Sequence, residues 1–424
     1  MLREYTAEFV QRYREQAPPQ VQSVLAKLAL CRTAALGGHV YKCPQCQSRC
    51  PVYNSCLERH CPLCRGGRRA DWLAATGALL LPDIDYFQVV FTMPDELSGL
   101  LLGNRRETYR LLFHAAWDAL REVLQEELGC EPAALMVLHT WNQRLDHHAH
   151  VHAVVPGGGP SLDGQRWVRS GPRTHRRRQK PYLVDNRLLS ARFRDKFLAG
   201  LTRLHRRGEL KLEGEWSHLQ EAAAFAAWRD TFREGAWVVY IEPPPNGSEP
   251  EHVLKYLARY LTGGPISDRR LISDAEGQVT FWVRSKDKAR RNQRERYRLS
   301  GVEFTRRWAL HILPQRFVKS RCFGGFSCQN RAAYLRRCRT LLDGEPRACP
   351  GTNVRGGAMA EAFPSAPVGP VCPRCETAME RIAEIPRPSW KRAFRGRHRP
   401  AWYAPWRPVR ASGPGPQEPE VPGG

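Results

Sequence analysis

Three histidines that alternate with small apolar residues form the most reactive pattern in this chain, His148-Ala149-His150-Val151-His152. Successive side chains of a β-strand point to opposite faces, so the three imidazoles are expected to share one face while the apolar residues are buried on the other. Neutral imidazole is a common metal ligand, and three of them on one strand face indicate a metal or phosphate site rather than packing.

Two tyrosines one helical turn apart, Tyr256 and Tyr260, are candidate nucleophiles. Ser248 and Glu251 fit a capping box at the start of their helix, and Gly263 follows its end. A spacing of four residues puts both phenols on one helix face. A phenol has a pKa of about 10 and is a weak nucleophile at neutral pH, so a divalent metal that polarises the attacked phosphate would help it. Two tyrosines allow one to hold a DNA strand while the other attacks the next.

The cysteines near the N-terminus have the spacing of zinc ligands. Fourteen residues separate two Cys-x-x-Cys pairs, and we expect one structural zinc on the four thiolates of Cys43, Cys46, Cys61 and Cys64. Four other residues are candidates for a second zinc site or for exchange with the first set: Cys31, His39, Cys56 and His60. A later Cys-x-x-Cys, at 372–375, repeats the spacing.

The chain is strongly basic. Its 424 residues include 66 Lys and Arg against 42 Asp and Glu, which gives a net charge of +24. Because basic residues recur along the whole length, a polyanionic partner is expected, with nucleic acid ahead of an anionic membrane. Two basic runs that include aromatic residues are typical of single-strand binding. Their candidate DNA-binding residues are Arg176, Arg177, Arg178, Lys286, Lys288, Arg290 and Arg291.

The apolar runs of the sequence are short. They fall far below the roughly 18 residues that cross a membrane, and the charged N-terminus lacks the apolar segment of a signal peptide. We therefore expect a cytoplasmic protein without a membrane partner, whose cysteines bind metal rather than form disulfides.

Helices and strands must position these candidate catalytic and metal-binding residues. Strands are expected at 85–91, 133–140, 148–155 and 236–242, and helices at 95–128 and 188–204. This alternation at hairpin spacing indicates an α+β fold with an antiparallel sheet. We expect a helix plus zinc-binding domain at 1–82, a catalytic domain at 83–325, and a basic, Pro- and Gly-rich extension at 326–424 that is mostly disordered.

The histidine pattern on its own fits two chemistries. Histidine-triad nucleotide hydrolases carry His-φ-His-φ-His-φ-φ, which residues 148–154 match, and there a histidine is the nucleophile. Rolling-circle endonucleases carry His-φ-His, here 150–152, as metal ligands. A zinc-ribbon DNA-binding regulator without catalysis is a third hypothesis. The tyrosine pair favours the endonuclease, because the hydrolases have no use for it.

Several motifs together resemble the two-tyrosine HUH transposases of bacterial insertion sequences, the IS91 type. In chain order they are Tyr53-Asn54-Ser55-Cys56, residues 59–64, residues 87–94, His139-Thr140-Trp141, residues 148–152, residues 256–260, and His311-Ile312-Leu313-Pro314 with Phe317. The resemblance implies an HUH-endonuclease-like antiparallel sheet flanked by helices and preceded by a zinc-ribbon-like domain.

The same resemblance implies a transposase that nicks and rejoins single-stranded DNA at element ends in rolling-circle transposition, through a 5′-phosphotyrosine. Tyr256 and Tyr260 would be the nucleophiles, and His150 and His152 would bind a catalytic Mg²⁺ or Mn²⁺. The third ligand stays open among His148, His252 and Asp146. Imidazole-rich sites chemically favour zinc, iron or nickel, whereas Mg²⁺ prefers oxygen, and Mn²⁺ reconciles this chemistry with the resemblance better. The implied partners are single-stranded DNA at transposon ends and target, and a host helicase, with the protein associated with the bacterial nucleoid.

Overall fold

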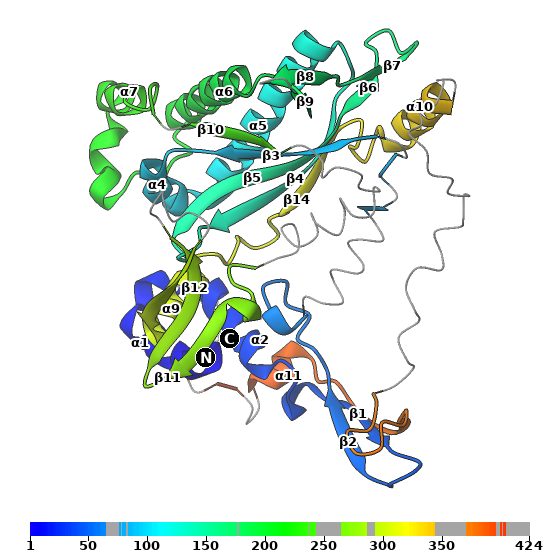
Figure 1. Ribbon diagram of the computed structural model, residues 1–424. Helices are drawn as coiled ribbons and strands as arrows, with labels where there is room; N and C mark the ends of the chain where they lie inside the picture. Colours follow the sequence, from blue (N-terminus) through cyan, green and yellow to red (C-terminus); the bar gives the residue numbers. More distant parts are fainter. Residues whose placement is uncertain are drawn as a thin grey trace, which may run out of the picture.

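The computed structural model describes residues 1–64, 76–77, 79–81, 84–175, 178–235, 237–242, 264–285, 293–343, 370–395, 399–400 and 402–403. These residues form two packed bodies and a short arm (Figure 1). One body contains a five-stranded sheet and is called the sheet body. The other contains the N-terminal helices and is called the zinc body for its cysteine group. No helix among the described residues combines the length and apolarity needed to cross a membrane.

The sheet body is organised around five antiparallel strands in the order β10-β3-β5-β4-β14. Their bounds are β3 (Tyr86–Thr92), β4 (Ala133–Trp141), β5 (His147–Pro156), β10 (Val238–Glu242) and β14 (Ser320–Gly324). The four strands expected from alternation are confirmed to within about two residues at each end. The histidine strand β5 lies in the centre of the sheet, between β3 and β4.

Helices cover one face of this sheet (Figure 1). They are α4 (Ser98–Gly103), α5 (Arg105–Leu128), α6 (Asn186–Arg206) and α7 (Ala222–Asp230). Ala149, Val151 and Ala153 of β5 are buried in this interface, as the alternation predicted. α5 ends at Gly129, which has the left-handed φ of 67° that favours glycine at a helix end.

The opposite face of the sheet carries two kinds of side chain. At one end, Leu135, Val137 and Val154 pack with α10 (Arg331–Asp343) and the small strand β7 (Trp167–Arg169), which pairs with β6 (Gly158–Pro160). At the other end this face presents the even-numbered histidines of β5. A two-stranded ribbon, β8 (Pro172–His175) with β9 (Arg178–Pro181), completes the body.

The zinc body collects segments from three parts of the chain around one apolar core. Its elements are α1 (Leu2–Arg12), α2 (Pro19–Leu30), the antiparallel sheet β11 (Leu271–Ala275), β12 (Gln278–Arg284) and β13 (Arg294–Ser300), then α9 (Gly301–Ala309) and α11 (Trp390–Arg395). The arm is the three-stranded sheet β15-β1-β2, formed by β1 (Gly38–Lys42), β2 (Arg49–Tyr53) and β15 (Glu380–Ile385).

This packing differs from the expected boundaries at 82/83 and 325/326. Residues 271–312 contribute Phe281, Phe304 and Trp308 to the core of the zinc body rather than to the sheet body. The C-terminal extension was expected to be mostly disordered, yet its described residues form α10, β15 and α11, and Phe394 and Tyr403 are buried. Within these described residues, a few apolar anchors hold stretches of a segment whose average composition is polar. Residues 344–369 and 404–424 lie outside the described residues.

Candidate active site and zinc centres

The histidine cluster consists of His150 and His152 on β5 and His139 on the neighbouring strand β4. His139 is the cross-strand partner of His150, and its ring centroid lies 4.4 Å from that of His152. One ring nitrogen from each of the three residues lies within 4.8 Å of the others. The cluster therefore presents three imidazoles to one point on the sheet face that α5 and α6 leave uncovered.

Hydrogen bonds orient two of these rings. Nδ1 of His150 donates to the backbone carbonyl of His148 over 2.9 Å, so its Nε2 keeps a lone pair for a ligand. Nδ1 of His152 lies 3.0 Å from the side-chain amide of Gln88 on β3. The contacting atom of Gln88 is Nε2, and its Oε1 is buried without a partner among the described residues, so an exchange of the amide oxygen and nitrogen would let Oε1 accept from Nδ1–H and put the lone pair of the His152 ring on Nε2.

Burial favours the uncharged form of His150 and His152. It lowers the pKa of His152 to about 4, and the nearby ammonium of Lys319 acts in the same direction. Burial also lowers the pKa of His150 well below its ordinary value, and the neighbouring histidines add to this shift. Because only the neutral imidazole has a lone pair to share, both residues are in the metal-binding form at neutral pH.

Of the expected third-ligand candidates, the two within the described residues, His148 and Asp146, are not part of this cluster. The side chain of His148 turns to Asp95, with Nδ1 2.6 Å from Oδ1, and the carboxylate of Asp146 binds Arg307 at 2.6 Å. His252 lies outside the described residues. The residue that joins the group is His139, which the sequence places in the His139-Thr140-Trp141 motif without indicating it as a ligand. A hairpin that turns at 142–146 places residue 139 opposite residue 150, so strand register was the signal that could have found it.

Tyr256 and Tyr260 lie outside the described residues, as do Arg176, Arg177, Lys286, Lys288, Arg290 and Arg291. Arg178 is the first residue of β9, but its side chain is not among those described.

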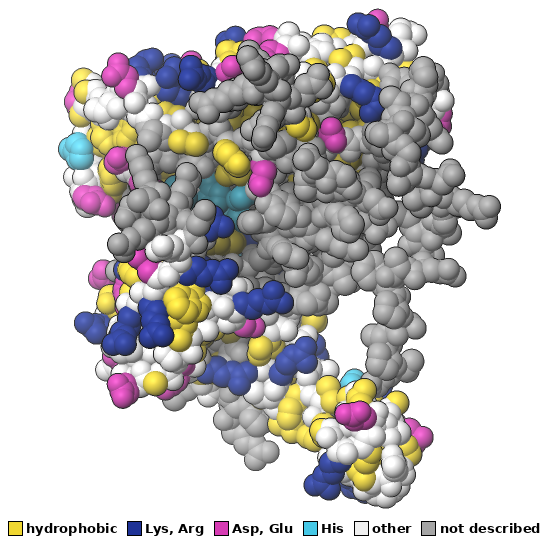
Figure 2. Space-filling model, in the orientation of Figure 1, with side chains coloured by type: hydrophobic (Ala, Val, Ile, Leu, Met, Phe, Trp, Pro, Cys, Tyr) yellow, Lys and Arg dark blue, Asp and Glu magenta, His cyan; other side chains and the backbone are white. Residues whose placement is uncertain are grey.

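An exposed arginine face continues the second basic run. Arg294, Arg296 and Arg298 alternate along β13 on its solvent side, and the guanidinium of Arg296 lies 5.9 Å from the ring centroid of Trp282 on β12. Tyr297 points the other way and packs against Phe281. Figure 2 shows Lys and Arg side chains gathered over the zinc body, on the same view in which histidine side chains reach the surface.

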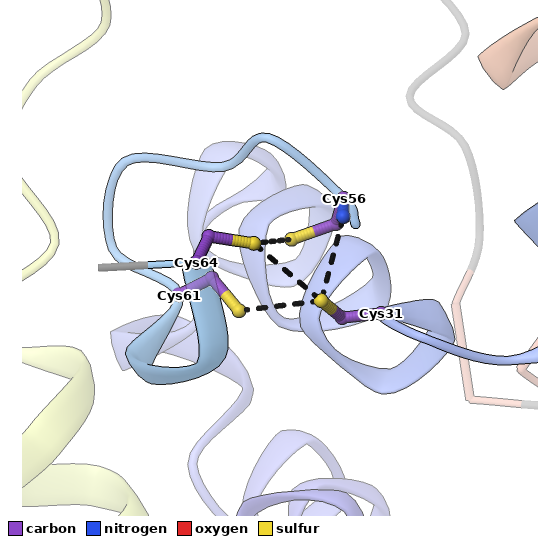
Figure 3. Close-up of side chains that lie close together, drawn as sticks. All are labelled: Cys31, Cys56, Cys61 and Cys64. Atoms are coloured by element: carbon purple, nitrogen blue, oxygen red, sulfur yellow. Dashed lines mark hydrogen bonds between the residues drawn. The ribbon is translucent and has the colours of Figure 1, made fainter. Parts of the chain in front are cut away.

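One cysteine group lies in the core of the zinc body and is formed by Cys31, Cys56, Cys61 and Cys64 (Figure 3). Cys31 ends α2, and Cys61 and Cys64 form a tight knuckle. The Sγ of Cys64 lies 3.6 Å from that of Cys31 and 3.7 Å from that of Cys56. A tetrahedral zinc with Zn–S bonds of about 2.3 Å requires sulfurs about 3.8 Å apart, so the group fits zinc.

The histidines proposed as alternative ligands take no part in either cysteine group. His60 donates from Nδ1 to Glu58 over 2.9 Å and accepts from the backbone N–H of Leu313 at Nε2 over 3.1 Å, so both ring nitrogens are engaged. His39 lies on β1 with its ring against Tyr41. Arg59 donates to the backbone carbonyl of Pro314 over 3.0 Å, and together these contacts join the cysteine knuckle to the sheet body.

The expected set of Cys43, Cys46, Cys61 and Cys64 is not a single site. Cys43 and Cys46 lie at the turn of the β1–β2 hairpin in the arm, where their partners are Cys372 and Cys375. Cys61 and Cys64 instead join Cys31 and Cys56. Spacing correctly identified each knuckle, but which knuckles share a metal depends on the path of the chain between them.

Two family models match the chain. A model described as "Putative transposase" matches residues 133–333, and an IS91-type model described as "Transposase zinc-binding domain" matches residues 1–93. The match to a zinc-binding domain and the cysteine groups support structural zinc. The two matched ranges include the histidine cluster and the Cys31 group, respectively.

Two curated relatives align over most of the chain. "Putative transposase y4qJ" of Sinorhizobium fredii (strain NBRC 101917 / NGR234) is 40% identical over 321 residues, which cover 75% of this chain and 77% of the relative. "Transposase for insertion sequence element IS801" of Pseudomonas savastanoi pv. phaseolicola is 29% identical over 350 residues, which cover 81% and 79%. No solved structure shows a significant match.

Proposed function

Since this chain belongs to the IS91-type transposases, we propose that it nicks and rejoins single-stranded DNA at element ends through a 5′-phosphotyrosine intermediate. The observation that carries this proposal is the histidine cluster, in which His139, His150 and His152 bring three imidazoles together on one sheet face, with His150 and His152 favoured in the neutral form by burial. A nucleotide hydrolase of the histidine-triad type would not account for the transposase matches.

The proposed step is a balanced exchange of phosphate esters. The phenol oxygen of Tyr256 or Tyr260 attacks phosphorus, and the bond from phosphorus to the 3′ oxygen breaks. The phenol loses its proton to solvent or a base, and the departing 3′ oxygen gains one. Attack by a 3′ hydroxyl on the phosphotyrosine reverses the exchange and rejoins DNA without ATP.

The histidine cluster fits a divalent cation such as Mn²⁺, which accepts imidazole ligands more readily than Mg²⁺ does. When bound, such a cation polarises the attacked phosphate and favours departure of the 3′ oxygen. His150 and His152 are fixed for this role by the His148 carbonyl and by Gln88. His139 and His152 are buried, which lowers the local dielectric and strengthens electrostatic interactions there.

The arginine face on β13 is the proposed binding surface for single-stranded DNA. Arg294, Arg296 and Arg298 offer phosphate contacts, and Trp282 offers a ring on which a base can stack. Neighbouring arginines on one side of a strand are about 6.8 Å apart, so they reach successive points along a nucleic-acid backbone.

A covalent adduct assay tests the proposed chemistry. The full chain is incubated with Mn²⁺ and a labelled single-stranded oligonucleotide that contains the element end, and the products are separated under denaturing conditions. We expect an adduct that Tyr256→Phe with Tyr260→Phe abolishes. An adduct that survives in this double variant would show that the nucleophile lies elsewhere.

Variants of the cluster test the ligand set in the same assay. His139→Ala is expected to lose the adduct as fully as His150→Ala does, because each removes one of three ligands. His148→Ala is expected to keep most of it, because the side chain of His148 contacts Asp95 and its carbonyl remains. The reverse ranking would make His148 the third ligand.

A further inference from the structure

The arm holds a second cysteine group whose members come from opposite ends of the chain. The Sγ atoms of Cys46 and Cys372 lie 3.6 Å apart, those of Cys43 and Cys375 4.0 Å, and those of Cys372 and Cys375 3.9 Å. A disulfide would need about 2.05 Å. A tetrahedral zinc thiolate site needs about 3.8 Å between sulfurs, given Zn–S bonds of about 2.3 Å.

The two knuckles of this group have the same backbone geometry. Cys43 N–H donates to Ser48 over 2.9 Å and Gln47 N–H donates back to Cys43 over 3.0 Å. In the other knuckle, Cys372 N–H donates to Thr377 and Glu376 N–H donates back to Cys372, both over 2.9 Å. Gln47 and Glu376 follow their second cysteines with left-handed φ angles of 61° and 56°.

The repeated backbone geometry of the two knuckles is what a shared metal site requires. Each Cys-Pro-x-Cys turn folds so that its two thiols point to one place, and the two turns face each other. Thr377 Oγ1 donates to Gln45 Oε1 over 2.8 Å, which adds a polar contact between the knuckles. Side chains that met only for apolar packing would not require the same strained backbone twice.

Apolar burial alone cannot hold the arm together. Among the described residues its buried cluster consists of Cys43, Cys372 and Met379, and the partly buried side chains packed against it are Tyr41, Cys46, Cys50 and Cys375. The three strands of the arm extend away from the two bodies (Figure 1). A three-stranded sheet with so small a core needs a cross-link or a metal to be stable.

We propose that Cys43, Cys46, Cys372 and Cys375 bind a structural zinc ion that closes the two ends of the chain into one arm. The match to the zinc-binding domain covers residues 1–93 and so contains only half of these ligands. The other half lies beyond both matched ranges, in the C-terminal extension.

The proposed zinc site in the arm also explains how the C-terminal extension reaches the zinc body. With the site closed, β15 pairs with β1 from Gly38 opposite Ile385 to Lys42 opposite Glu380. The chain then continues to α11, and Phe394 of this helix and Tyr403 beyond it enter the core that contains the Cys31 group. The site can close only when the C-terminal Cys-x-x-Cys is present, so a chain shortened before residue 370 keeps an open arm.

The number of zinc ions bound per chain tests the proposed site in the arm independently of DNA cleavage. The purified full chain is analysed for bound metal by atomic emission, with protein measured by amino-acid analysis. We expect the wild-type chain to hold one zinc ion more than Cys372→Ser with Cys375→Ser, a difference to which any ion on the histidine cluster contributes equally in both proteins. Cys50→Ser is the matched control, because Cys50 lies in the same arm but outside both groups, and its zinc content should equal that of the wild type. Equal zinc contents in the wild type and the double variant would overturn the proposal.

Thiol alkylation distinguishes an opened arm from a misfolded chain. In Cys372→Ser with Cys375→Ser, Cys43 and Cys46 should react with N-ethylmaleimide at least about tenfold faster, because an unbound thiol loses the protection of the metal. The buried Cys31 group should stay protected as in the wild type. Cys375→His should restore both the second zinc and the protection, since zinc accepts three cysteines and a histidine. If Cys43 and Cys46 stay protected from alkylation in the double variant, the proposed zinc site in the arm is contradicted.

Discussion

The backbone carbonyl of Leu145 accepts a hydrogen bond of 3.1 Å from Nε2 of His311, and Nδ1 of the same ring lies 3.2 Å from the hydroxyl of Thr140. Leu145 forms the turn between β4 and β5, has a φ of 66°, and is fully buried in the core of the zinc body. The hairpin that carries the histidine cluster is therefore anchored at its tip in the other body.

Removal of this anchor should destabilise the protein. Leu145→Ala deletes a buried side chain and is expected to lower the free energy of unfolding by about 2–5 kcal/mol, with a matching fall in adduct formation as the hairpin loosens. Urea denaturation followed by tryptophan fluorescence measures the first effect.

Leu57→Ala is the matched control, because Leu57 has a similar φ of 56° but is 60% exposed. It should change the stability by less than about 0.5 kcal/mol. Equal losses in the two variants would mean that backbone conformation, and not burial of Leu145, sets the cost.

His311 should make stability depend on pH. Burial lowers its pKa to about 3, whereas an unfolded histidine titrates near 6.5. Between these values the unfolded chain binds a proton that the folded chain does not, so stability is fully present above about pH 6.5 and falls as the pH drops. At pH 5.5 this residue alone should cost about 1.4 kcal/mol relative to pH 7.5.

The test compares urea unfolding at pH 7.5 and 5.5 in the wild type and in His311→Gln, which cannot titrate. The variant should lose less stability between the two pH values, although it is less stable at pH 7.5. Acid release of metal affects both proteins and cancels in the comparison. His218→Gln, which removes an exposed histidine, is the control. A pH dependence that His311→Gln leaves intact would assign it to other groups.

Gln88 should control metal affinity although it is not a ligand. Its amide lies 3.0 Å from Nδ1 of His152 and fixes that ring. Gln88→Leu is expected to weaken Mn²⁺ binding about 10- to 100-fold, as is usual when the partner of a ligating histidine is removed. Isothermal titration with Mn²⁺ measures the change.

Gln88→Glu separates orientation from packing, because a carboxylate can still accept from Nδ1–H of His152. It should restore most of the affinity that Gln88→Leu loses, and Gln125→Leu, on the exposed side of α5, should have no effect. If Gln88→Glu binds Mn²⁺ as weakly as Gln88→Leu, the hydrogen bond does not orient the ring.

The proposed phosphate contacts of the arginine face predict how the affinity for single-stranded DNA depends on salt concentration. Each phosphate contact on a single strand contributes about 0.7 to the slope of log affinity against log salt, so Arg296→Ala should reduce the slope by about that amount. Trp282→Ala should cost about 1–3 kcal/mol of binding with little change in slope, and Trp282→Phe should keep most of it. Fluorescence anisotropy of a labelled oligonucleotide from 50 to 300 mM salt measures both, under metal-free conditions that prevent cleavage.

Arg207→Ala removes the same charge from the end of α6 in the sheet body, where the side chain is 69% exposed. Its binding and slope should match the wild type. If Arg207→Ala and Arg296→Ala weaken binding equally, net charge rather than this face attracts the DNA.

Periodicity in the sequence correctly predicted the central strands and the burial of the odd-numbered side chains of β5. Alternation is a local property, and a strand with small apolar residues on one side can be buried on that side alone. Each Cys-x-x-Cys turn could also be predicted from sequence, because it depends only on neighbouring residues: two thiols three residues apart point to one place whatever surrounds them. The transposase motifs, too, could be recognised from residue types in order.

Only the tertiary structure decided how these local units combine. His139 meets His150 because β4 and β5 pair in one register, and His148, one of the two outer residues of the run, turns to Asp95 instead. Cys43 meets Cys375 across more than 300 residues because the extension returns to the arm. Spacing along the chain determines which donors can act together in one turn, whereas the ligand set of a metal depends on distances between turns. Those distances follow from strand register and core packing, which no single segment contains.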